Sequence, residues 1–220
     1  MSAPDSPLPG SDVLLNVTAW HEAGHALAAM REGRPLRHVV IEHDRPGFGQ
    51  TRYDPDTWQQ RYCPKKSHGN ARAAWEEALA NHLSRLRITL AGPLAEARKL
   101  GQPMRALGAW YDFEDTYWLA QSLMTVQLDL RKHGVYFVPN VPSLFNLECR
   151  RVRHWLARPV TWSAINRIAQ ALIEQGELSA RDVLQCYLQA RNPAQHSLTL
   201  DWPTEADDER ASPETWRDAA

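Results

Sequence analysis

The chain has few cysteines: Cys63, Cys149 and Cys186 are the only three in 220 residues. Their number is odd, they lie far apart, and no two of them form a C-x-x-C pair. A disulfide framework or a thiolate zinc site needs closely patterned or evenly numbered cysteines. The sequence therefore predicts free thiols in a reducing compartment.

Long apolar runs are also missing, because His, Glu or Arg breaks each run well before the roughly 18–20 residues that a membrane-spanning helix needs. Residues 1–10 lack the basic-then-apolar pattern of a signal peptide. The formal net charge is −1, so no general surface for nucleic acid or lipid is indicated. We expect a cytoplasmic protein that binds neither nucleic acid nor membrane.

The composition suits one globular domain, with 43% hydrophobic and 23% charged residues. We expect a flexible leader over residues 1–11 and a domain over residues 12–191. Residues 192–220 are expected to form a disordered or loosely helical tail, because residues 201–220 hold seven acids and two arginines.

The most informative stretch is apolar and runs from Val13 to Met30. It contains the pattern H-E-x-x-H at His21, Glu22 and His25. In a helix, residues four apart share a face, so both imidazoles can reach one zinc ion. Glu22 lies beside the first histidine, where its carboxylate can take a proton from a zinc-activated water. The motif predicts a zinc metallopeptidase.

The alternative for this motif is a surface helix with two solvated histidines. The flanking residues are mostly Val, Leu, Ala and Met, which favours a buried helix, and a buried histidine needs a polar partner. Gly24 lies in the middle of the predicted helix, where glycine costs about 1 kcal/mol relative to alanine. We expect another backbone or a substrate to pass close to Gly24.

A short hairpin is predicted beside this helix. The helix can be capped by Ser11 or Asp12, and Gly33 ends it. Residues 37–43 are rich in β-formers, and a Gly-rich turn separates them from a second short strand over residues 50–53. Residues 12–53 therefore predict a zinc helix with a hairpin.

Most of the remaining chain predicts helices. Residues 54–69 are polar and contain proline, which indicates a loop. We expect this loop to lie over the cleft of the predicted zinc site. Asn70 is predicted to cap a long helix that Gly92 and Pro93 interrupt or kink. Val135 to Pro142 are expected to be extended. The other predicted helices cover residues 112–133, 143–157, 161–175 and 179–191.

The last of these helices opens with Ser179-x-x-Asp182, which resembles a capping box. Residues 70–191 thus form a helical part beside the hairpin. The predicted fold class is mainly α, of the α+β type, with a zincin-like helical peptidase domain and a small β-hairpin or sheet beside the H-E-x-x-H helix.

A catalytic zinc site needs a third protein ligand. Spacing alone does not choose among the acids and histidines that the chain offers. His38 and His43 lie on a predicted strand, which favours partly exposed surface positions. The acidic candidates are Glu96, Asp112, Glu114 and Asp115.

Five segments share the residue patterns of one peptidase family. They are Ala19 to Leu27, Val39 to Thr51, Leu90 to Gly101, Gly108 to Ala120 and Ala171 to Ser179. They resemble parts of the peptidase domain of FtsH-type ATP-dependent zinc proteases. In chain order, these parts are the zinc helix, the short strand and edge strand, the glycine–alanine–glutamate helix, the stretch with an aspartate ligand, and the C-terminal helices. The zinc helix and the Asp112 segment are the most specific parts.

The resemblance implies that His21, His25 and Asp112 ligate zinc. A helix N-terminus suits an ionised Asp112, although aspartate is also a common N-cap. Asp115 is the alternative ligand. Glu96 is expected to support the site or to be structural.

By the same resemblance, Glu22 is the general base, and Gly49, Gln50 and Thr51 bind an extended peptide by β-augmentation. The implied function is zinc-dependent hydrolysis of peptide bonds in unfolded or flexible polypeptides. The 220 residues contain no G-x-x-x-x-G-K-[ST] loop, so ATP-driven unfolding is not expected from them. A separate ATPase or self-assembly stays open as a partner.

Two other interpretations remain. One is a non-proteolytic zinc-binding helical module that acts in interaction or regulation. Glu22 counts against it, since a purely structural zinc site has no use for that carboxylate. The other is a nucleic-acid-binding protein, supported only by the cluster Arg150, Arg151, Arg153 and His154, which is more typical of a solvated helix face.

Overall fold

The computed structural model describes three stretches, residues 10–54, 71–104 and 141–192. It also describes single positions between them, namely Asp112, Glu114, Tyr117, Trp118, Gln121, Met124, Leu128, Arg131 and Lys132, all of them helical. The predictions for the Asn70 cap, for nearly all of the leader and the 54–69 loop, and for the acidic tail concern residues outside this set.

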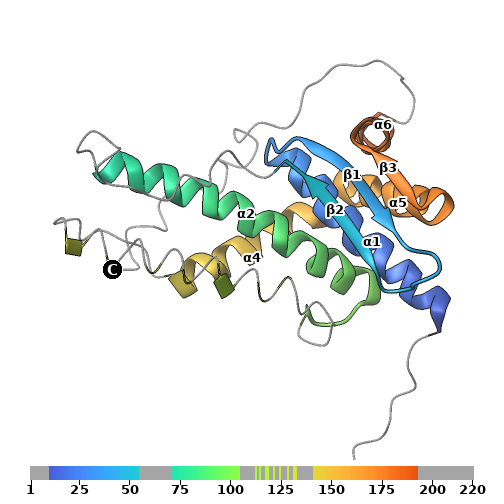
Figure 1. Cartoon of the computed structure of the whole chain (residues 1–220), viewed down its shortest axis with the longest axis horizontal. Helices are drawn as coiled ribbons and strands as arrows, with labels where there is room; N and C mark the ends of the chain where they lie inside the picture. Colours follow the sequence, from blue (N-terminus) through green and yellow to red (C-terminus); the bar gives the residue numbers. More distant parts are fainter. Residues whose placement is uncertain are drawn as a thin grey trace, which may run out of the picture.

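The fold is mainly helical, with one small antiparallel sheet of three strands (Figure 1). This confirms the predicted mainly α class with a small sheet. Within the three described stretches, no helix has both the length and the apolar character needed to cross a bilayer.

Helix α1 (Ser11–Arg31) is the central element and contacts α2, α5 and both strands of the hairpin (Figure 1). Residues 18–20 and 22–29 are all buried, as expected for a helix whose apolar residues surround its axis. The prediction that Ser11 or Asp12 caps it is wrong. Its N-cap is Gly10, which makes no side-chain cap, and the helix begins at Ser11.

The predicted hairpin is present, formed by β1 (Leu36–Ile41) and β2 (Gly49–Tyr53). A third strand, β3 (Glu177–Ser179), pairs with the other side of β1, so the order is β2-β1-β3. The sequence analysis missed β3 because three residues carry no readable alternation, and Leu178 is its only buried residue.

Helix α2 (Ala71–Leu100) runs beside α1 and continues through Pro93, so the predicted interruption at this point is wrong. A proline inside a helix removes one backbone hydrogen bond, and packing against α1 offsets that loss. The two helices approach closely at small residues. A Cβ on Gly24 would lie 2.5 Å from the carbonyl oxygen of Ala91 and 2.9 Å from the Cβ of Ala95. This confirms that another backbone passes close to Gly24.

Three helices complete the described fold: α4 (Val141–Ala157), α5 (Pro159–Gln175) and α6 (Ala180–Arg191). Helix α4 begins earlier than expected, so Val141 and Pro142 are helical rather than extended, and the first turn of a helix tolerates proline. The capping box of Ser179 and Asp182 at α6 is confirmed, with Ser179 as N-cap rather than first helical residue.

Candidate metal centre

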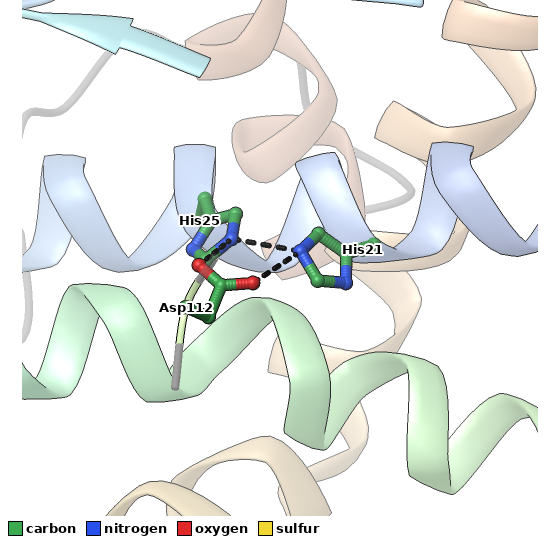
Figure 2. A group of neighbouring side chains, drawn as sticks. All are labelled: His21, His25 and Asp112. Atoms are coloured by element: carbon green, nitrogen blue, oxygen red, sulfur yellow. Dashed lines mark hydrogen bonds and ion pairs between the residues drawn. The ribbon is translucent and has the colours of Figure 1, made fainter. Parts of the chain in front are cut away.

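Three side chains from two parts of the chain converge on one small space (Figure 2). The Nε2 atoms of His21 and His25 are 3.0 Å apart. Asp112 faces both rings, with its Oδ2 atom 2.9 Å from His21 Nε2 and its Oδ1 atom 3.3 Å from His25 Nε2. The structure thus brings together the three residues that the family resemblance selects as ligands.

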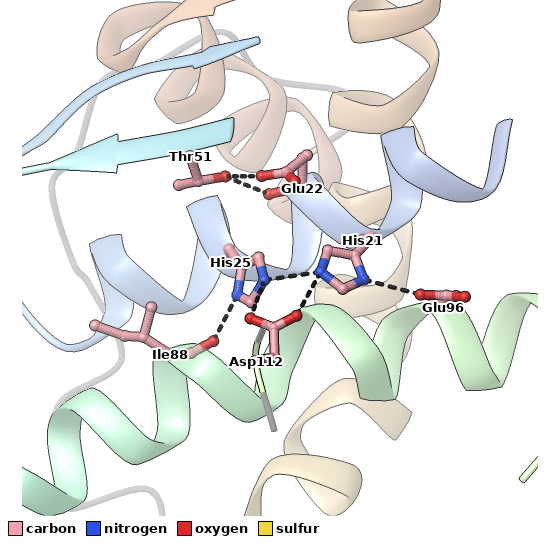
Figure 3. Close-up of polar contacts among 7 residues, drawn as sticks. All are labelled: His21, Glu22, His25, Thr51, Ile88, Glu96 and Asp112. Atoms are coloured by element: carbon pink, nitrogen blue, oxygen red, sulfur yellow. Dashed lines mark hydrogen bonds and ion pairs between the residues drawn. The ribbon is translucent and has the colours of Figure 1, made fainter. Parts of the chain in front are cut away.

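The position of the two rings follows from helix geometry. His21 and His25 are four residues apart on α1, so both lie on the face that packs against α2 (Figure 3). Space for the second ring depends on Gly92 of α2, because a Cβ there would lie 2.3 Å from His25 Nε2. The glycine beside Pro93, expected to break the helix, instead makes room for a ring of the site.

The outer nitrogens of both rings are held by α2. The Nδ1 atom of His21 lies 2.9 Å from Glu96 Oε2, and that of His25 lies 2.8 Å from the carbonyl oxygen of Ile88 (Figure 3). A carboxylate and a carbonyl can only accept hydrogen bonds, so each Nδ1 carries a proton and donates it. In the neutral rings, each Nε2 atom therefore presents a lone pair to the shared space.

This arrangement fits a bound cation. Two imidazole nitrogens and a carboxylate face one another, and with both rings neutral no hydrogen lies between them, so the cluster takes up either a proton or a metal ion. Around a tetrahedral zinc ion with bonds of about 2.0–2.1 Å, neighbouring ligand atoms are about 3.3 Å apart. The two Nε2 atoms, 3.0 Å apart, come close to that value, and each lies 2.9 or 3.3 Å from one of the two Asp112 oxygens. Two imidazoles and a carboxylate are also ligands that zinc accepts.

The electrostatics point in the same direction. Burial lowers the pKa of His21, but hydrogen bonds with Asp112 and Glu96 and the charge of Glu22 outweigh burial and raise the pKa to about 10. Burial raises the pKa of Asp112, but hydrogen bonds with His21 and His25 outweigh it and hold the pKa well below its usual range. The raised pKa of His21 expresses the negative potential of the acids around it, which attracts a proton or a metal ion, and the lowered pKa of Asp112 keeps this carboxylate ionised.

Glu22 lies beside this cluster, on the side of α1 that faces β2 (Figure 3). Its side chain is buried, and the Thr51 hydroxyl donates a hydrogen bond of 2.7 Å to its Oε2 atom. Gly49 also approaches Glu22 closely, whereas Gln50 is exposed and accepts a hydrogen bond from Arg52. Two of the three predicted peptide-binding residues thus contact the predicted base.

The other candidate ligands with described positions stay outside the cluster. Glu96 reaches the outer nitrogen of His21 rather than the shared space. His38 lies 3.7 Å from Glu177, and His43 donates to the Ile173 carbonyl. Glu114 is exposed. Asp115, the alternative ligand, lies outside the described residues.

Sequence reasoning missed two supports of the site, the Ile88 carbonyl and the space at Gly92. A backbone carbonyl carries no signal in the residue type, and the sequence predicts for Gly92 only that, with Pro93, it interrupts or kinks the helix. A comparison with models of known protein families finds no match, and a search of curated proteins finds none either. The functional assignment therefore depends on the chemistry of the site.

Proposed function

We propose that this chain is a zinc metallopeptidase, with a zincin-like catalytic domain of the FtsH type, that hydrolyses peptide bonds of unfolded or flexible polypeptides. One observation carries the proposal: two imidazole nitrogens and the Asp112 carboxylate converge within hydrogen-bonding distance of one another, and a second acid, Glu22, follows the first histidine directly.

The proposed roles follow from the contacts. His21, His25 and Asp112 hold the zinc, while Glu96 and the Ile88 carbonyl fix the tautomer and orientation of the two rings. When bound, zinc polarises a carbonyl group and makes water a stronger acid. Glu22 takes a proton from the attacking water and gives it to the leaving amine nitrogen.

The number of ligands favours catalysis over a purely structural metal site. Structural zinc sites have four protein ligands, whereas catalytic sites have three and keep one position open. Within the described part of the chain, the cluster offers three ligand residues. A structural site would also give no reason to bury a carboxylate such as Glu22 beside it.

The test combines metal analysis with cleavage of an unfolded protein, such as casein, by the wild type and by Glu22→Gln. We expect about one zinc per chain in both proteins, because Glu22 is not a ligand. Cleavage by Glu22→Gln should be slower by about 100-fold or more, which is the usual contribution of a general base.

Stoichiometric zinc without Glu22-dependent cleavage would instead support the non-proteolytic zinc-binding module. The proposed substrate is a polypeptide that is already unfolded. A separate ATPase that delivers it, or self-assembly of the chain, is compatible with the same chemistry.

A further inference from the structure

The register of the sheet fixes the place of Thr51. Val39 of β1 pairs with Thr51 on one side and with Leu178 of β3 on the other, and Val39 is fully buried. Ile41, also buried, pairs with Gly49. Directly paired residues point to the same face of a sheet, so Thr51 and Gly49 share the face that packs on α1. A slip by one residue would turn both away from the helix.

Thr51 makes a directed contact with Glu22 (Figure 3). Its Oγ1 atom lies 2.7 Å from Glu22 Oε2 and 3.1 Å from the Glu22 backbone carbonyl oxygen. A hydroxyl has one hydrogen, and the shorter contact to a charged acceptor is the stronger one. Glu22 is only 6% exposed, so its carboxylate depends on protein donors. Among the described residues, Thr51 is the donor to this carboxylate.

The second oxygen of Glu22 lies against Gly49. A Cβ on Gly49 would lie 2.6 Å from Glu22 Cγ and 2.9 Å from Oε1. Glycine is therefore required for β2 to come this close to the acid. Two residues of β2 thus fix the position of the Glu22 carboxylate: Thr51 binds Oε2, and Gly49 leaves space beside Oε1.

From this geometry we propose that Thr51 is a positioning residue for Glu22: its hydrogen bond to Oε2 fixes the orientation of the carboxylate that exchanges the proton. The inference deepens the proposed peptidase function and rests on it. In the step concerned, one O–H bond of the attacking water breaks and an O–H bond to the Glu22 carboxylate forms. That proton later moves to the leaving amine nitrogen, while Thr51 keeps its own hydrogen throughout.

Thr51→Val is the informative variant, because valine keeps the shape and the strand preference of threonine but lacks the hydroxyl. We expect kcat for casein cleavage to fall about 10–100-fold, since misplaced reacting groups lose rate of that order. KM should change by less than about twofold, because the lost interaction orients the base rather than the substrate. Zinc content should stay at the wild-type level.

Two controls separate positioning from a general effect on folding. Thr51→Ser restores the hydroxyl and should recover most of kcat. Thr161→Val makes the same change at a buried threonine of α5 and should cleave like the wild type. If Thr51→Val keeps the wild-type kcat, or if Thr51→Ser does not recover it, the inference is wrong while the proposed function stands.

A second readout needs neither zinc nor substrate. In metal-free protein, the urea midpoint should fall on Thr51→Val in the wild-type background and fall clearly less in a Glu22→Ala background, because the partner is then gone. Equal shifts in both backgrounds would overturn the contact and with it the inference. A wild type without Glu22-dependent cleavage would overturn the proposed function and the positioning role together.

Discussion

Two clusters of partly or fully buried charged or polar side chains link α2 to α1 or to the residue that follows α1, and they differ in which groups face one another. In the first, Arg87 of α2 lies 3.1 Å from Glu32, just after α1, and 2.6 Å from Glu148 of α4. Arg151 adds a second cation to Glu148 at 2.8 Å. In the second, the candidate metal centre, the facing atoms of His21, His25 and Asp112 are all acceptors when the rings are neutral.

This difference distinguishes a cluster that stabilises the fold from a cluster that can bind a ligand. Glu148 is completely buried, yet each of its carboxylate oxygens has a guanidinium partner, so the Arg87 cluster is closed and needs nothing from outside. The facing atoms of the candidate metal centre, by contrast, can take up a proton or a metal ion. Buried charge by itself therefore does not indicate a site, whereas metal-ligating atoms that converge on one space do.

The largest expected effect comes from breaking the closed cluster with Arg87→Met. The change leaves Glu148 and Glu32 without their shared cation, and loss of one partner of a buried ion pair costs about 3–5 kcal/mol. We expect the free energy of unfolding, measured by urea denaturation, to fall by that amount. The folded fraction should still bind about one zinc per chain.

Arg151→Met is the matched control. Its side chain is 47% exposed, and Glu148 keeps its contact with Arg87, so we expect Arg151→Met to cost clearly less than Arg87→Met. A loss of zinc in folded Arg87→Met would show that the two clusters are not independent, and equal costs for both substitutions would show that the depth of burial does not matter.

The second prediction concerns a variant that lowers the metal affinity of the candidate metal centre without removing a ligand. Glu96→Ala takes away the acceptor at His21 Nδ1, and loss of such a support typically lowers metal affinity about 10–100-fold. Competition with a zinc chelator measures it. Glu96→Gln keeps an acceptor oxygen at this position, so its affinity should lie between those of the wild type and Glu96→Ala. Zinc affinity unchanged in Glu96→Ala would show that the His21 ring needs no such support.

How far the sequence predicts each region depends on how local the information is. The H-E-x-x-H spacing puts both histidines on one face of a single helix, and the hairpin follows from two short runs around a turn. Both are local patterns, and both elements are present. Asp112 came from the family resemblance, because no spacing within one element connects it to the histidines.

The features that the sequence did not predict depend on contacts between residues that are far apart in the chain. The continuous course of α2 through Pro93 depends on packing against α1, and β3 exists because β1 offers it an edge. The Arg87 cluster joins residues from three parts of the chain, and no pattern along the sequence connects them. Residue type predicted which groups could react, while tertiary packing decided which of them meet.

The smallest expected effect concerns a carboxylate at the surface. Compared with the two clusters, it shows how much a hydrogen-bonded acid contributes to the free energy of unfolding when it is not buried. Hydrogen bonds from the side chain and the backbone of Ser179 hold the pKa of Asp182 below its ordinary value of 3.8. Ser179→Ala removes the cap of α6 and should lower the free energy of unfolding by about 1 kcal/mol at neutral pH.

The pH dependence of this cap has a definite sign. A carboxyl group with a lower pKa in the folded than in the unfolded state stabilises the fold above its unfolded pKa, and the contribution is lost as the pH falls through the folded pKa. The difference between the wild type and Asp182→Asn in urea denaturation should therefore be full at pH 6 and should shrink once the pH drops below 3.8. A difference that stays constant from pH 6 to strongly acidic conditions would mean that the charge of Asp182 adds nothing, and that only the geometry of the cap does.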